Sequence, residues 1–160
     1  MSISPAAAVP GFDTRLAAYC VVIHEDRILL ALWDMRGSDP GFIPRWVLPG
    51  GGVELGESTR NAAVREVAEE TGYRVELDEL LDVQTAVIPA AKRYSGPDRP
   101  MQTVAVLYRA HTVSGELRHE TGGSTSEAGW FSFEQVAALN RIPRVDAAIA
   151  DYLAQREERK

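Results

Sequence analysis

The sequence predicts a single α/β (α+β) domain in which a mixed β-sheet is sandwiched between helices. A chain of 160 residues with 45% hydrophobic content is long enough to bury a core and short enough for one domain. Apolar segments with strand character are interspersed with two helical segments. No repeat of about 20 to 50 residues and no Ser-, Thr-, Gly- or Pro-rich linker divides the chain.

The N-terminal part is expected to form a tail and a hairpin. Residues 1–14 are rich in Ala, Ser and Pro, which predicts a flexible tail before a domain at 15–156. Apolar segments predict a first strand at 15–23 and its partner at 27–33. Cys20, the only cysteine, falls in the first strand, where a buried structural role is commoner than a reactive thiol.

A loop rich in Gly, Pro and Asp follows at 34–45 and leads into a short apolar strand at 46–49. Loops of this length in a compact domain are frequently binding elements. We therefore consider Arg36, Phe42 and Arg45 candidates for substrate contact, with ordinary loop solvation as the alternative.

A glycine turn followed by an amphipathic helix is the most informative stretch of the chain. The three glycines at 50–52 let the backbone bend sharply and approach a ligand closely. Ser58 is a good N-cap, and Gly72 stands where a left-handed residue would end a helix. These signals predict a helix at about 59–71, whose apolar stripe should pack on the sheet.

The predicted helix also carries a cluster of carboxylates. At about 100° per residue, Glu66, Glu69 and Glu70 fall on one face, opposite the apolar stripe. Carboxylates a few ångströms apart repel one another unless a cation neutralises them, and oxygen-only ligands favour Mg²⁺ or Mn²⁺. Arg65 would offset part of this charge. The alternative is a solvated acidic helix face.

This stretch resembles a known motif, the Nudix box G-x5-E-x7-R-E-U-x-E-E-x-G-U, in which U is a bulky apolar residue. Seven fixed positions match without a gap, which chance would produce at about 10⁻⁸ to 10⁻⁹ per starting position. Tyr73, at the last U position, is a mild departure because an aliphatic residue is commoner there. The fixed positions are filled by Gly51, Glu57, Arg65, Glu66, Glu69, Glu70 and Gly72. The chain therefore resembles the Nudix hydrolases.

The resemblance implies a Nudix-like mixed sheet between helices and an enzyme that acts on acid anhydrides in phosphorus-containing substrates. It also implies a divalent metal cofactor, Mg²⁺ or Mn²⁺. The metal ligands would be Glu66, Glu69 and Glu70, assisted by the backbone carbonyl of Gly51.

The resemblance assigns further roles around this cluster. Arg65 and Glu57 would orient the metal-binding carboxylates. Nudix chains often carry an acid just before a Trp-Phe pair, and in some members a carboxylate from this region reaches the metal site. Glu127 is the candidate here, with an exposed acid at a strand end as the alternative. The general base would be Glu66, Glu70 or Glu127.

Two further strand segments follow the helix. Alternating residues predict strand structure at 74–86, and a strongly β-forming segment at 102–112 predicts a central strand. The segment 88–100 between them contains three prolines and three basic residues and is typical of a loop. It offers phosphate contacts and a stacking ring, although a solvated hairpin loop is equally compatible. The candidate substrate residues are Lys92, Arg93 and Tyr94. The core candidates of 74–86 are Val75, Leu77, Leu80 and Leu81.

The C-terminal part alternates polar and apolar segments. We expect the polar stretch 116–126 to be mobile. A strand should follow at 127–131 and a short capped helix at 132–139. An amphipathic helix at 145–156 should pack on the core, and 157–160 should form a charged tail.

Charge and hydropathy limit the possible partners. Seventeen basic against 23 acidic residues give a formal charge of −6, which argues against binding polymeric nucleic acid. No apolar run approaches the ~20 residues of a membrane span, and a signal-peptide pattern is missing. We therefore expect a cytoplasmic monomer or homodimer whose partner is a small nucleotide substrate.

The expected reaction is metal-dependent hydrolysis of a diphosphate linkage in a nucleoside diphosphate linked to another moiety. The compact chain resembles the MutT-type enzymes, which convert a nucleoside triphosphate to monophosphate and pyrophosphate. ADP-ribose and nucleotide sugars are alternative substrates. A non-catalytic nucleotide-binding regulatory domain is the alternative of another class. Loss of a box glutamate would mark that alternative, and none is lost.

Overall fold

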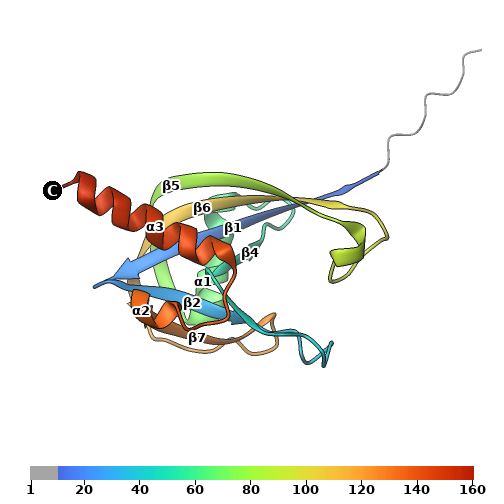
Figure 1. Cartoon of the computed structure of the whole chain (residues 1–160), viewed down its shortest axis with the longest axis horizontal. Helices are drawn as coiled ribbons and strands as arrows, with labels where there is room; N and C mark the ends of the chain where they lie inside the picture. Colours follow the sequence, from blue (N-terminus) through green and yellow to red (C-terminus); the bar gives the residue numbers. More distant parts are fainter. Residues whose placement is uncertain (1–10) are drawn as a thin grey trace, which may run out of the picture.

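The computed structural model describes residues 11–160 and shows a mixed β-sheet with helices on both faces (Figure 1). Residues 1–10 of the expected tail lie outside the described part of the chain. The strands are β1 (Asp13–His24), β2 (Arg27–Trp33), β3 (Arg45–Val47), β4 (Gly50–Gly52), β5 (Tyr73–Ile88), β6 (Met101–Gly115) and β7 (Thr125–Ser132). The helices are α1 (Thr59–Thr71), the 3-10 turn η1 (Ala90–Lys92), α2 (Phe133–Val136) and α3 (Pro143–Glu158). Within residues 11–160 no helix has the length and apolar content to cross a membrane.

The sheet is organised around β1 and β6. Its strand order is β3-β2-β1-β6-β5, and β4 and β7 pair with β1 and β2, respectively. β1 and β6 run parallel, from Asp13 opposite Met101 to Val22 opposite Ala110. β5 and β6 form a long antiparallel hairpin. The prediction of a central strand at 102–112 is confirmed, because β6 lies between β1 and β5.

Alternate residues of β6 enter two separate cores, because successive side chains of a strand point to opposite faces. Val106 and Tyr108 pack in the core beneath α1. Ala105 and Leu107 pack in the core beneath α3. The sheet is therefore buried on both faces, as the sequence predicts. The buried helix residues in the two cores are Ala62, Ala63 and Val67 from α1, Val136 from α2, and Val145, Ala148 and Ile149 from α3.

The buried environment of Cys20 agrees with the structural role expected for it. Its side chain is 0% exposed, in the core between the sheet and α1. Burial raises the pKa of the thiol to about 12. The reactive thiolate is therefore negligible near neutral pH in the folded protein.

Several boundaries differ from the sequence-based expectation. β1 begins at Asp13, inside the expected tail, because pairing with Met101 continues the parallel ladder to that residue. α3 continues to Glu158, so the helix includes the first residues of the expected charged tail. The core assignment of Leu80 is wrong: its side chain is 55% exposed, because β5 is the last strand of the sheet.

Candidate active site

Both ends of α1 are set by the residues that the sequence indicates. The Ser58 side chain accepts a hydrogen bond from the Asn61 N–H at 3.1 Å. Gly72 has φ of 80° and its N–H donates to the Ala68 carbonyl, which is the left-handed C-terminal cap. A Cβ at Gly72 would lie 2.2 Å from the Glu116 carbonyl oxygen, so glycine is required there. These caps fix where α1 begins and ends.

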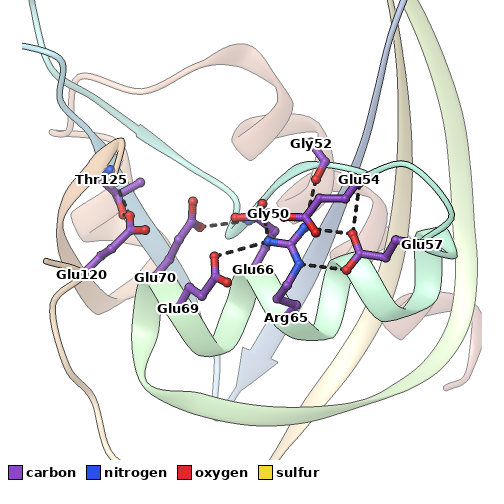
Figure 2. A network of polar contacts seen from close by, with 10 residues as sticks. All are labelled: Gly50, Gly52, Glu54, Glu57, Arg65, Glu66, Glu69, Glu70, Glu120 and Thr125. Atoms are coloured by element: carbon purple, nitrogen blue, oxygen red, sulfur yellow. Dashed lines mark hydrogen bonds and ion pairs between the residues drawn. The ribbon is translucent and has the colours of Figure 1, made fainter. Parts of the chain in front are cut away.

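Arg65 is the centre of the polar network in Figure 2. Its Nε and Nη2 donate to the two carboxylate oxygens of Glu57 at 2.8 and 2.9 Å, a bidentate pair. Nη2 also donates to the Gly52 carbonyl at 3.1 Å. Nη1 donates to Glu66 at 3.1 Å and to Glu69 at 3.3 Å. One guanidinium thus joins β4, which the three glycines form, to the acidic face of α1.

Glu57 is stabilised in its ionised form by this arrangement. The hydrogen bonds from Arg65, together with the N–H of Glu54, lower the pKa of Glu57 to about 2. The same pairing raises the pKa of Arg65. This part of the site therefore carries its own neutralising charge.

Glu66 and Glu70 are in a different environment. Glu70 is 3% exposed, and its Oε2 accepts a hydrogen bond from the Gly50 N–H at 2.9 Å. Burial raises the pKa of Glu70 well above its usual value, and repulsion from Glu66 adds to the shift. Burial also raises the pKa of Glu66, although Arg65 opposes this. Glu70 is therefore held away from water without a cationic partner among residues 11–160, whereas the half-buried Glu66 shares the charge of Arg65.

The glycine strand β4 lies directly against this carboxylate pair. A Cβ at Gly51 would stand 2.7 Å from the carboxyl carbon and Oε1 of Glu66, closer than real side chains approach. The absence of a side chain thus lets the backbone of β4 reach the acidic face of α1. Figure 2 shows Gly50, Gly52 and the glutamates of α1 grouped around this contact.

A further carboxylate, Glu120, reaches the same group from the loop before β7 (Figure 2). It accepts hydrogen bonds from the Thr125 N–H at 3.2 Å and from the Thr125 hydroxyl at 2.5 Å. Its charge contributes to the raised pKa of both Glu66 and Glu70, after burial as the main cause. The sequence pattern does not single out Glu120, because the polar stretch 116–126 is expected to be mobile. The contact of Glu120 with Thr125 depends on how this loop folds back, which sequence spacing does not reveal.

Glu127, the acid that the resemblance suggested, lies on β7 itself and not in the loop that carries Glu120. It is exposed on β7, opposite Leu32 in the ladder. It lies near Arg36, whose pKa is raised mainly by its hydrogen bond to Asp34 and slightly by the charge of Glu127.

The two loops proposed for substrate contact meet in an open hollow of about 550 Å³. The rings of Trp33 and Phe42 pack edge to face with centroids 4.8 Å apart, and Tyr94 lies 5.7 Å from Phe42. The Arg45 guanidinium lies 5.2 Å from the Trp33 ring centroid. The hydroxyls of Ser38 and Tyr94 are 2.9 Å apart, which ties the loops together. The lining residues are Trp33, Ser38, Asp39, Phe42, Arg45, Ala91, Lys92, Arg93 and Tyr94.

Two of the predicted substrate residues, Arg36 and Arg93, form ion pairs with acids of the chain. Arg36 donates to Asp34 at 2.6 and 2.9 Å and does not line the hollow. Arg93 is 8% exposed and pairs with Asp13 at 2.7 Å and with the Arg99 carbonyl at 2.9 Å. The structure therefore gives Arg93 a role in holding its own loop. Lys92 is exposed at the rim of the hollow.

The acidic face is not a closed metal cage. No three His, Cys, Asp or Glu side chains in the part of the chain from 11 to 160 are gathered as a preformed metal site. Glu69 instead pairs with Arg65. The donors are nevertheless all oxygens, two of them are buried or half-buried with raised pKa, and a glycine backbone adjoins them. This donor set suits a hard divalent cation.

Comparison with known proteins adds an independent line of support. The sequence model of the NUDIX domain matches residues 13–153. The chain is 31% identical over 157 residues to a Methanocaldococcus jannaschii protein named ADP-ribose pyrophosphatase, covering 94% of this chain and 75% of that one. It is 36% identical over 117 residues to a MutT-like protein of Streptomyces ambofaciens, covering 73% of this chain and 63% of that one. A solved NUDIX hydrolase from Nitrosomonas europaea has the same fold, with a TM-score of 0.72 at 24% identity, covering 89% and 90% of the chains.

Proposed function

Because this chain belongs to the Nudix family of hydrolases, which act on phosphorus anhydride bonds, we propose that it hydrolyses a diphosphate linkage in a nucleoside diphosphate joined to another group. The observation that carries the proposal is the pair of buried Glu70 and half-buried Glu66, with raised pKa values and a glycine backbone against them. Such a pair binds positive charge, and a diphosphate needs positive charge to be approached by a nucleophile.

The residues that would hold a divalent cation are Glu66, Glu69, Glu70 and the carbonyl of Gly51. Members of this family generally use such cations, and the oxygen-only donors favour Mg²⁺ or Mn²⁺. When bound, the cation lowers the pKa of a water molecule and offsets charge on the phosphate oxygens. Arg65 keeps Glu66 and Glu69 oriented through its hydrogen bonds and is itself held by Glu57.

We assign the proton-accepting role to Glu120 rather than to Glu127. A carboxylate bound tightly to a cation is a poor base, so a neighbouring carboxylate outside the donor set is better suited. Glu120 lies beside Glu70, and the Thr125 N–H and hydroxyl hold it in place. It would accept the proton that the attacking water loses. Glu66 and Glu70 are the alternatives for this role.

The hollow between the two loops would receive the nucleoside. The rings of Trp33, Phe42 and Tyr94 offer faces and edges on which a base packs. Arg45 and Lys92 lie at the same hollow and suit phosphate or ribose oxygens. Trp33 pairs with Thr125, the residue that holds Glu120, so the hollow adjoins the acidic site. Arg36 and Arg93 would contribute indirectly, because their ion pairs with Asp34 and Asp13 hold the two loops in place.

The substrate class follows from the relatives more than from the box. The compact chain points to a nucleoside triphosphate, and the MutT-like relative aligned with 73% of the chain supports that class. The relative that aligns with 94% of the chain is named ADP-ribose pyrophosphatase. The longer alignment includes both substrate loops, so we place ADP-ribose first and nucleoside triphosphates second.

A product-resolved screen tests the proposal. The purified protein is incubated with Mg²⁺ or Mn²⁺ and, separately, with ADP-ribose, nucleotide sugars, nucleoside triphosphates and dinucleoside polyphosphates. We expect AMP and ribose 5-phosphate from ADP-ribose, and no product when the metal is chelated. Monophosphate and pyrophosphate from a triphosphate would reverse the ranking of substrates. Nucleotide binding without turnover of any compound would favour a regulatory domain and overturn the hydrolase assignment.

A further inference from the structure

Strand β5 ends the sheet and has an unpaired edge within residues 11–160. Its inner edge pairs with β6 without a bulge from Asp82 to Ile88. Alternate N–H and C=O groups therefore point away from the sheet along the outer edge, where they can pair with another strand. Figure 1 shows β5 along the outside of the molecule.

The C-terminal half of β5 lacks the features that normally prevent an edge strand from pairing with another chain. The segment 83–88 reads VQTAVI, with no charge, proline or glycine. Soluble proteins usually place lysine, proline or a bulge on an edge strand to prevent pairing. Val83 and Val87 are 52% and 68% exposed, and Thr85 between them is exposed too.

These three side chains lie on one face of the sheet. Val83 is directly opposite Val106, which packs beneath α1, and Thr85 and Val87 follow at intervals of two. α1 covers this face farther along the strand but leaves Val83 and Val87 exposed. A β-branched, uncharged strip is thus available beside an edge that can form hydrogen bonds.

The strip is complementary to itself. If two copies pair antiparallel around a two-fold axis at Thr85, Val83 of each copy faces Val87 of the other, and the two Thr85 residues face each other. Cross-strand pairs of β-branched residues stabilise antiparallel sheets. In this register Asp82, the nearest charge, faces Ile88, so two copies of a chain with net charge −6 bring no like charges together at the pairing.

We propose that two copies of this chain join through their β5 edges, in antiparallel register around Thr85, to form a sheet that continues across a symmetric homodimer. β5 leads directly into η1 and then Tyr94, so the pairing would also hold the base of the loop that lines the hollow. The proposal does not depend on the hydrolase activity.

A cysteine substitution tests the register directly. Cys20 is the only cysteine and is 0% exposed, so a new surface thiol is the only accessible one. Thr85→Cys should form a covalent dimer under mild oxidation, reversed by reductant, because the two thiols face each other across the axis. Val113→Cys, on β6 where the side chain is 43% exposed, is the matched control and should remain uncrosslinked.

Mass in solution provides the second readout. Sedimentation or light scattering should give twice the 17.5 kDa of one chain for the wild type. Thr85→Lys places two like charges at the axis and should raise the dissociation constant of the dimer at least about tenfold, whereas Val113→Lys should not. Circular dichroism confirms folding of both variants. A monomeric wild type at tens of micromolar, or a dimer indifferent to Thr85→Lys and uncrosslinked by Thr85→Cys, would overturn the proposal.

Discussion

Two carboxylates of the polar network, Glu57 just before α1 and Glu70 near the end of α1, balance their charges in opposite ways. Glu57 forms a bidentate pair with Arg65, and its pKa falls to about 2. Glu70 is buried with one N–H for support, and its pKa is raised well above the usual value. The first pair is complete within the chain, whereas the second group gains from positive charge that arrives from outside. The contrast separates a supporting end of the network, at Glu57 and Arg65, from a binding end, at Glu70.

The largest expected effect comes from removing charge at the binding end. Glu70→Gln keeps the shape and the contact with Gly50 but removes a metal-binding carboxylate. We expect metal-dependent turnover to fall by at least about 10²-fold, with the fold intact. Steady-state rates at saturating Mg²⁺ and circular dichroism measure the two quantities. Glu76→Gln, an exposed acid on β5, is the control, and near-native turnover of Glu70→Gln would contradict the assignment.

A comparison of Glu120 and Glu127 tests which one serves the site. Glu120→Gln should reduce turnover by about 10- to 10²-fold, because it removes the proposed proton acceptor. Glu127→Gln should change it by less than about twofold, because this exposed carboxylate lies near Arg36 instead. The reverse order of effects would return the role to Glu127.

A substitution at Arg65 examines the supporting end. Arg65→Lys keeps the charge but loses the bidentate pairing with Glu57 and the bond to the Gly52 carbonyl. We expect about tenfold weaker metal affinity or turnover, the effect typical of residues that orient metal ligands. Metal titration followed by tryptophan fluorescence separates affinity from rate. Unchanged affinity and rate would show that the network does not position the glutamates.

The smallest expected effect is on how the unfolding free energy of the metal-free protein changes with pH. Since the pKa of Glu70 is higher in the folded protein than unfolded, its ionisation opposes folding. Between the unfolded pKa near 4.5 and the folded value, this group lowers the unfolding free energy by up to about 1.4 kcal/mol per pH unit as pH rises. Denaturant unfolding in chelator across pH 5 to 8 measures the slope. Glu70→Gln should have a flatter profile and equal or greater stability at neutral pH. Identical profiles would contradict the charge imbalance at Glu70.

The fold was largely predictable because its determinants are local. Ser58 and Gly72 mark the two ends of α1, as their capping preferences indicate. The apolar pattern of 102–112 predicts the central strand. Leu80 was misassigned because alternation shows which residues share a face but not whether anything covers that face. Coverage depends on strand order, and no short-range pattern reveals that β5 lies at an edge.

The sequence by itself determined the helix, its aligned glutamates and the family, because residues a few positions apart on one helix have a fixed geometry. Only the tertiary structure decided that Glu120 lies beside Glu70, and that Arg93 forms an ion pair with Asp13. These choices depend on contacts between segments far apart in the chain. Such contacts form only when loops close on the completed sheet, so their partners are chosen by three-dimensional packing and not by spacing in the sequence.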